Sequence, residues 1–220
     1  MLFIVSTPIG NLEDTSLRAI RTLKEADLVA AEDTRCTQIL FNKYEISTRL
    51  ISYHSQSGVM KLDKILAELK AGKQVALVSD AGTPGISDPG YPLILAAIEA
   101  GIEVIHVPGP SAFLAALTVS GFPINKFQYW GFIPHKKGRQ TFMANLKETP
   151  LTTVFYESSH RIQKLLREML EILGGERQIC VARELTKKFE EVLRGPLSEV
   201  NAQIQSKEPK GEYVVVVKAQ

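Results

Sequence analysis

Positive charge is missing from the middle of this 220-residue sequence. No lysine or arginine occurs between Lys73 and Lys126. The same interval holds four carboxylates, at Asp80, Asp88, Glu99 and Glu103. The phosphate-binding patterns G-x-x-x-x-G-K-[ST] and G-x-G-x-x-G are also absent. Because a nucleoside triphosphate normally requires a lysine, an arginine or a metal in addition to backbone amides, these absences argue against an ATP-type ligand here.

Other absences narrow the class of protein. No apolar run approaches the roughly 18 residues of a membrane helix, so no membrane association is expected. The first residues, Met1 to Val5, follow no basic segment, which favours a strand over a signal peptide. The only two cysteines, Cys36 and Cys180, lack metal-like spacing, and the four histidines are scattered. We therefore expect a cytoplasmic protein with free thiols and no metal site.

The last part of the chain is rich in positive charge. Residues 126–220 hold 16 basic and 11 acidic side chains. A basic second half after a neutral-to-acidic middle indicates that the protein handles two different ligands.

Short apolar runs alternate with helical patterns in the first half of the sequence, as in βαβ units. Strands are expected at 2–5, 28–31, 49–52, 74–78 and 102–107, and helices at 17–26, 37–42, 59–71 and 91–100. In the second half, strands are expected at 127–132, 153–156, 178–184, 190–194 and 213–217, and helices at 111–120, 141–147, 162–173 and 197–205. These patterns predict two α/β domains, residues 1–110 with a mostly parallel sheet and residues 111–220 with a mixed sheet.

The loop from Ser79 to Gly90 is the most informative segment. It contains three glycines and two prolines in twelve residues and follows a buried strand. In open α/β sheets ligands bind beyond the carboxyl ends of strands, which is where this loop is expected. A carboxylate there suits ribose hydroxyls, an amine or a cationic ligand such as S-adenosylmethionine. The plain alternative is an ordinary connection between a strand and a helix.

Four other segments carry more polar side chains than a simple connection needs. They are Glu32–Arg35, the basic loop Gly131–Arg139, Phe155–Arg161 and Ala182–Glu191. The basic loop lies beside aromatics and suits contacts with phosphates and bases of RNA. Each segment also has a structural explanation, as a helix cap or as solvated surface charge.

Taken together and in order, the motifs resemble the ribosomal RNA small subunit methyltransferase I family of the tetrapyrrole methylase superfamily. The resemblance is carried by Ser79–Gly90, Val107–Ala112, Gly131–Pro134, Phe155–Arg161, Ala182–Lys187 and Gly211–Val214, and it extends over essentially the whole chain. It implies a fold of two α/β domains of the class III methyltransferase type, with S-adenosylmethionine in the cleft between them. It also implies a homodimer that 2′-O-methylates a cytidine in the decoding region of small-subunit (16S) rRNA, either as free rRNA or in the 30S ribosomal subunit.

Site residues are expected from the resemblance for the cofactor, and from the chemistry of the polar segments for catalysis and RNA. Cofactor contacts are expected at Pro8, Asp80, Ala81, Gly82, Ile86, Ser111, Ala112 and Tyr156. Catalytic positions are expected at Glu184, His54 and Lys187, the first two as candidate general bases. RNA contacts are expected at Arg35, Lys136, Lys137, Arg139, His160, Arg161 and Arg183. The segment after His54, Ser55 to Gly58, departs from the family's pattern, which weakens the assignment of His54.

Two alternatives remain open from the sequence. One is a related methylase that acts on a small tetrapyrrole, which the basic second half disfavours. The other is a non-catalytic RNA-binding assembly factor, against which the intact Asp80 loop argues.

Overall fold

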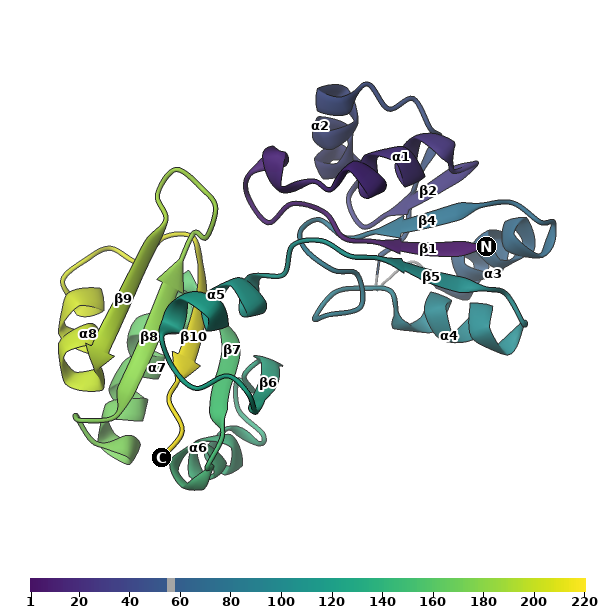
Figure 1. Cartoon of the computed structure of the whole chain (residues 1–220). Helices are drawn as coiled ribbons and strands as arrows, with labels where there is room; N and C mark the ends of the chain where they lie inside the picture. Colours follow the sequence, from purple (N-terminus) through teal and green to yellow (C-terminus); the bar gives the residue numbers. More distant parts are fainter. Residues whose placement is uncertain (55–57) are drawn as a thin grey trace. The chain divides into compact units, whose positions relative to one another are not determined.

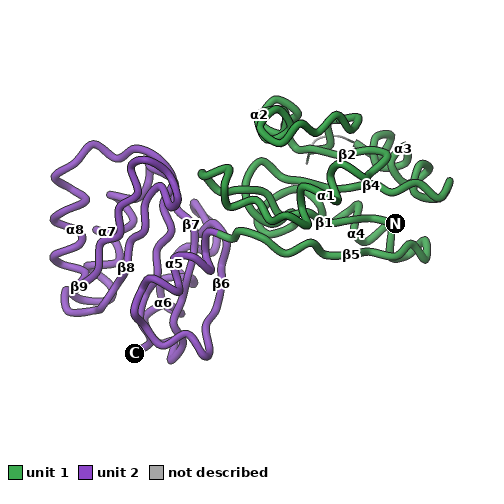
Figure 2. The backbone as a smooth tube through the Cα atoms, turned by 45° about the horizontal axis from the view of Figure 1, so that its top comes forward, with its two compact units in different colours: residues 1–111 green, residues 112–220 purple. Residues whose placement is uncertain are grey.

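The computed structural model describes residues 1–54 and 58–220, which form two compact units, residues 1–111 and 112–220 (Figure 2). Residues 55–57, in the divergent segment after His54, lie outside the described residues. Each unit is built on one five-stranded sheet with helices packed against it. The prediction of an α/β fold is therefore confirmed.

Unit 1 has an entirely parallel sheet in the order β3-β2-β4-β1-β5. Its strands are β1 (Leu2–Val5), β2 (Leu28–Ala31), β3 (Leu50–Ser52), β4 (Val75–Val78) and β5 (Val104–Val107). Every residue of β2 and β4 is buried. Continuous apolar strands of this kind are typical of a parallel sheet with both faces covered.

Helices cover both faces of this sheet (Figure 1). The helices α1 (Leu17–Glu25) and α2 (Thr34–Tyr44) bury Leu23 and Phe41 against one face, and a short 3-10 turn, η1, spans Leu12–Asp14. The helices α3 (Gly58–Lys70) and α4 (Tyr91–Glu99) bury Ile65 and Leu93 against the other. Because all five strands run parallel, their carboxyl ends lie at one end of the sheet, called the carboxyl edge below.

Unit 2 has a mixed sheet in the order β6-β7-β10-β8-β9. Its strands are β6 (Phe127–Phe132), β7 (Thr152–Ser158), β8 (Gln178–Arg183), β9 (Glu191–Pro196) and β10 (Glu212–Val217). The pair β6–β7 is parallel and the other pairs are antiparallel. The sheet of unit 2 is therefore mixed, with a single parallel pair at one side.

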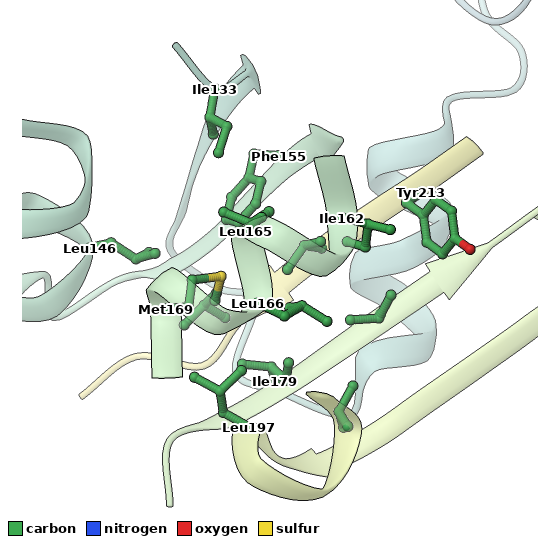
Figure 3. Packing of buried hydrophobic residues seen from close by; sticks show 14 of the residues in the cluster. Ile133, Leu146, Phe155, Ile162, Leu165, Leu166, Met169, Ile179, Leu197 and Tyr213 are labelled. Atoms are coloured by element: carbon green, nitrogen blue, oxygen red, sulfur yellow. The ribbon is translucent and has the colours of Figure 1, made fainter. Parts of the chain in front are cut away.

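The core of unit 2 lies between the sheet and three helices, α6 (Arg139–Glu148), α7 (Ser159–Leu173) and α8 (Leu197–Gln205). Phe155 from the sheet packs among Leu165, Leu166 and Met169 of α7 in this cluster (Figure 3). The helix α5 (Ala112–Ser120) packs against β7, β8 and β10. Truncating Phe155 to alanine would cost about 3–5 kcal/mol, because the surrounding core could only partly close the cavity.

The helices α2 and α7 each begin three residues earlier than expected, and for α2 a local hydrogen bond explains why. The helix α2 starts at Thr34 instead of Thr37, because the Asp33 carboxylate caps it by accepting the N–H of Arg35 at 2.8 Å. The helix α7 starts at Ser159 instead of Ile162, directly after β7, which is two residues longer than expected at its carboxyl end. Both boundaries fall in the polar segments that the sequence had marked as unusual.

Candidate functional site

Three loops at the carboxyl edge of the unit 1 sheet are joined by hydrogen bonds. Thr7, after β1, and Gly82, after β4, exchange two backbone hydrogen bonds of 2.8 and 3.0 Å. The Thr7 hydroxyl also donates to the Ser79 carbonyl at 3.1 Å. These contacts bring two predicted cofactor positions, Pro8 and Gly82, into adjoining loops.

The loop after β5 joins the same arrangement. Thr83 Oγ1 shares a hydrogen bond of 2.9 Å with Ser6 Oγ and donates to the Pro110 carbonyl at 3.3 Å. The backbone of Gly109 lies so close to Ser6 that an added Cβ would approach the Ser6 Cβ to 2.9 Å. Glycine is therefore required at position 109, and the chain leading to Ser111 is held beside the Ser79–Gly90 loop.

The carboxylates of unit 1 meet at this edge. The Asp80 carboxylate accepts the N–H of Asp33 at 2.9 Å, and the N–H of Asp80 donates to the Glu32 carboxylate at 3.4 Å. Asp33 in turn pairs with the guanidinium of Arg35 at 2.6 Å. The structure thus brings together Asp80, Arg35 and a residue not among the predicted site positions, Glu32.

These carboxyl groups differ in their pKa values. Burial raises the pKa of Glu32, the N–H of Asp80 opposes the shift, and the negative charge of Asp80 adds to it. An electrostatic interaction with His54 acts on the pKa of Glu32 in the opposite direction, so His54 lies near the same edge. Hydrogen bonds from Arg35 lower the pKa of Asp33 to about 2. Glu32 could have been selected from the sequence, since it directly follows a buried strand.

The other predicted cofactor positions of unit 1 lie in the same loops. Ala81 and Ile86 are exposed, and the N–H of Ile86 donates to the Thr83 carbonyl at 3.2 Å. Ser87 next to it has a positive φ of 64°, so the loop holds an unusual shape without glycine at that position. The edge therefore offers carboxylates, hydroxyls and exposed backbone, an inventory that suits ribose, an amine or a sulfonium.

In unit 2, a buried ion pair lies at the carboxyl end of β7. The side chain of Glu157 is fully buried and pairs with the guanidinium of Arg161 at 2.7 Å. Arg161 also donates to Ser158 Oγ at 3.1 Å and contacts His135 Nε2. Glu157 and Ser158 belong to β7 and His135 belongs to the basic loop, so Arg161 links β7 to that loop.

A second arginine fastens the same loop. Arg139 donates to the Glu168 carboxylate at 2.8 Å through Nε and to the Pro134 carbonyl at 3.1 Å. Because both guanidinium groups are used within unit 2, the structure favours a structural part for Arg139 and Arg161 over the predicted RNA contacts. Lys136 and Lys137 lie between His135 and Arg139, the two residues that attach the loop. Both lysines are exposed and make no ion pair with the described residues.

Tyr156 belongs to an aromatic group at the β6 side of the unit 2 sheet. Its ring lies 5.6 Å from that of Tyr129 and 5.5 Å from that of Phe132, and Tyr129 stacks on Phe113 at 4.4 Å. The helix carrying Phe113 begins at Ala112, another predicted cofactor position. His160 is exposed in the first turn of α7.

Glu184 and Lys187, two predicted catalytic residues, are paired. Lys187 Nζ lies 2.9 Å from the Glu184 carboxylate and 2.6 Å from that of Glu212. Burial acts to raise the pKa of Glu184, but Lys187 and the N–H of Glu212 outweigh it and lower the pKa. A carboxylate stabilised in this way is a weak base, so the geometry does not favour Glu184 as the proton acceptor.

Arg183 is also engaged within unit 2. It donates to the Lys210 carbonyl at 2.7 Å and lies 3.8 Å from Glu191. Among residues 1–54 and 58–220, no group of three or more His, Cys, Asp or Glu side chains is arranged to hold a metal ion. No helix in the same ranges is both long and apolar enough to cross a membrane.

Comparison with known proteins decides the family. Residues 1–201 match the family Tetrapyrrole (Corrin/Porphyrin) Methylases. The chain belongs to the tetrapyrrole methylases. The predicted resemblance is therefore confirmed, and this methylase is a methyltransferase that uses S-adenosylmethionine.

Curated relatives carry one common name. The protein named "Ribosomal RNA small subunit methyltransferase I" of Thermotoga maritima is 49% identical over 216 residues, covering 98% of this chain and 97% of the relative. Proteins of the same name from Halalkalibacterium halodurans and Escherichia coli O157:H7 are 49% and 44% identical, each covering 98% of this chain and 75% and 77% of the relative.

Solved structures share the fold of this methylase. A diphthine synthase superposes with a TM-score of 0.76 at 16% identity, covering 99% of this chain and 89% of the other. A cobalt precorrin-4 methyltransferase superposes with a TM-score of 0.72 at 16% identity, covering 99% and 94%. At these identities the likeness establishes the fold alone.

Proposed function

We propose that this methylase transfers a methyl group from S-adenosylmethionine to the ribose 2′-oxygen of a cytidine in the decoding region of small-subunit rRNA. The observation that carries the proposal is the basic loop of unit 2, in which Lys136 and Lys137 are exposed between His135 and Arg139, whose side chains both contact α7. A rigid, cationic loop supports recognition of a phosphate backbone. The common name of relatives 44–49% identical to this chain supports the same substrate.

The residues at the edge of unit 1 fit the cofactor. Asp80 and Glu32 supply negative charge beside the Ser79–Gly90 loop, and residues 74–125 contain no cation that would repel a sulfonium. Asp80 would bind the ribose or amine, and the backbone near Pro8, Ala81 and Gly82 would line the adenosine. The cofactor supplies an electrophilic methyl group, and the surrounding chain orients it and excludes water.

A ribose hydroxyl is a poor nucleophile until its proton is accepted. We retain His54 as a candidate acceptor and add Glu32, because its raised pKa makes it a stronger base than an ordinary carboxylate. Glu184 and Lys187 would shape the loop after β8, and His160 and Arg35 remain candidate RNA contacts. No metal ion is needed for this chemistry.

We also propose a cytoplasmic location, because an rRNA substrate, free or within the 30S subunit, would be found there. We also propose a homodimer. Leu114 and Val119 on α5 are 47% and 39% exposed, and Phe132 on the edge strand β6 is 54% exposed. Large apolar side chains gathered on neighbouring elements support an interface with a second copy. Light scattering on the purified protein would then give twice the chain mass of 24.3 kDa, and a mass of one chain would contradict the dimer.

Mapping ribose methylation tests the proposed function. Small-subunit rRNA from cells with and without this gene is hydrolysed with alkali, which spares the bond next to a 2′-O-methyl group. The proposal predicts one protected cytidine in the decoding region that disappears without the gene. An unchanged protection pattern would contradict it.

A further inference from the structure

We propose that Phe189 and Lys188 form a second RNA contact, in which the Phe189 ring stacks on an unpaired base and Lys188 pairs with an adjacent phosphate. The inference rests on the proposed function and adds a binding site to it. Phe189 lies in the loop of residues 184–190, between β8 and β9.

Hydrogen bonds and ion pairs hold this loop at its base. The N–H of Glu184 donates to the Glu212 carbonyl at 3.0 Å, and the N–H of Glu212 donates back to the Glu184 carboxylate at 3.0 Å. Lys187 Nζ bridges the carboxylates of Glu184 and Glu212. The loop is therefore attached to β10 as well as to its own two strands.

The backbone of the loop is held in an unusual shape. Glu184 and Thr186 have positive φ values of 50° and 67°, which residues other than glycine rarely adopt. Glu184 packs so closely on Gly211 that an added Cβ there would lie 2.5 Å from it. The N–H of Thr186 donates to the Glu190 carboxylate at 2.5 Å. Strained residues retained in this way are enriched at binding and catalytic sites.

The end of this rigid loop presents an aromatic ring and a cation to solvent. Phe189 is 65% exposed, and Lys188 Nζ lies 5.5 Å from the centre of its ring. Lys187 is used in ion pairs, whereas Lys188 has no carboxylate partner among the described residues.

A single exposed phenylalanine on a protein surface needs no explanation. Here the ring is held in place together with a cation, and single-stranded RNA is bound by this combination of stacking and phosphate pairing. An unpaired base of the negatively charged substrate is therefore the occupant that fits both groups.

The test compares Phe189→Ala, Phe189→Trp and Lys188→Gln with the unmodified protein. The probe is a single-stranded fragment of the decoding region carrying 2-aminopurine beside the target cytidine. We expect Phe189→Ala to weaken binding by roughly 5- to 100-fold and to lose the quenching of 2-aminopurine, with no change in the salt dependence. Phe189→Trp should restore both, because indole stacks at least as well. Lys188→Gln should reduce the slope of log affinity against log salt by about 0.7.

Ile39→Ala is the matched control, since Ile39 is 61% exposed on α2 in unit 1. Its affinity should equal that of the unmodified protein. Affinity of Phe189→Ala within twofold of the unmodified protein would overturn the inference. So would a change in molecular mass with Phe189→Ala, because it would assign the ring to a protein interface. Absence of a protected cytidine in the mapping of ribose methylation would instead contradict the proposed function.

Discussion

Asp80 combines a structural and a ligand-binding part in one side chain. Its carboxylate accepts the N–H of Asp33, the residue that caps α2, yet the residue itself is exposed at the edge of the sheet. Removing the side chain should therefore affect both the protein and the ligand. Removing only its charge should separate the two effects.

Asp80→Asn keeps an oxygen that can accept the N–H of Asp33 but loses the negative charge. We expect its melting temperature to stay near that of the unmodified protein and its affinity for S-adenosylmethionine to fall about tenfold. Asp80→Ala should weaken binding at least as much and lower the melting temperature by about 2–4 °C, the effect of one lost capping-type hydrogen bond of about 1 kcal/mol. Calorimetric titration and thermal melting measure both. Wild-type affinity in Asp80→Asn would restrict Asp80 to a structural part.

Replacing Glu32 by glutamine is expected to stabilise the protein in a pH-dependent way. Because the pKa of Glu32 is raised in the folded protein, its charged carboxylate lowers the stability of the fold above that pKa. This destabilisation disappears as the pH falls and the carboxylate is protonated. Glu32→Gln should therefore raise the melting temperature by roughly 1–3 °C at pH 7.5, with the gain vanishing near pH 4. Methyl transfer should fall if Glu32 accepts the proton.

The control for this comparison is Glu103→Gln, since Glu103 is an exposed carboxylate that directly precedes β5, at the opposite, amino end of the strands. It should leave both melting temperature and activity unchanged. If Glu32→Gln raised the melting temperature equally at pH 7.5 and near pH 4, or at neither pH, the charged Glu32 carboxylate would not be destabilising.

At the scale of single elements, the basic side chains in and next to the basic loop have two different roles. Lys136 and Lys137 face solvent, whereas Arg139 and Arg161 hold the loop to α7. The buried carboxylate of Glu157 depends on Arg161 for its charge partner. Leaving a buried charge unpaired is strongly destabilising.

The double variant Lys136→Gln with Lys137→Gln should keep its melting temperature and lose about 1.4 from the slope of log RNA affinity against log salt, or about 0.7 per contact. Arg161→Gln should instead lower the melting temperature by several degrees. Lys147→Gln, which removes an exposed lysine from α6, should change neither quantity. An unchanged slope in the double lysine variant would mean that the loop does not contact phosphate.

Most strands were predictable from the sequence because they are short apolar runs between turns. Buried β4, Val75 to Val78, is an example. The start of α2 was missed because it depends on one side chain, Asp33, bonding to the backbone. The pairs Arg139–Glu168 and Arg161–His135 join residues 29 and 26 positions apart, so no local pattern indicates them. For the same reason, nothing in the sequence distinguished Arg139 from the two lysines of the loop.

At the scale of the whole molecule, each unit carries one kind of chemistry. The edge of the unit 1 sheet gathers carboxylates, whereas unit 2 presents the lysines of its basic loop. The uneven distribution of charge in the sequence already indicated two ligands. In the fold, the carboxylates around Asp80 lie in unit 1 and the exposed lysines of the basic loop lie in unit 2. We propose that this combination directs a tetrapyrrole methylase to RNA.

The most direct test of this account gives the purified protein a choice of acceptors. It is incubated with S-adenosylmethionine labelled in the methyl group, together with small-subunit rRNA, 30S subunits or a uroporphyrinogen. The account predicts label in rRNA, free or within the subunit, recovered as 2′-O-methylcytidine, and none in the tetrapyrrole. Label in the uroporphyrinogen with none in either RNA acceptor would contradict it.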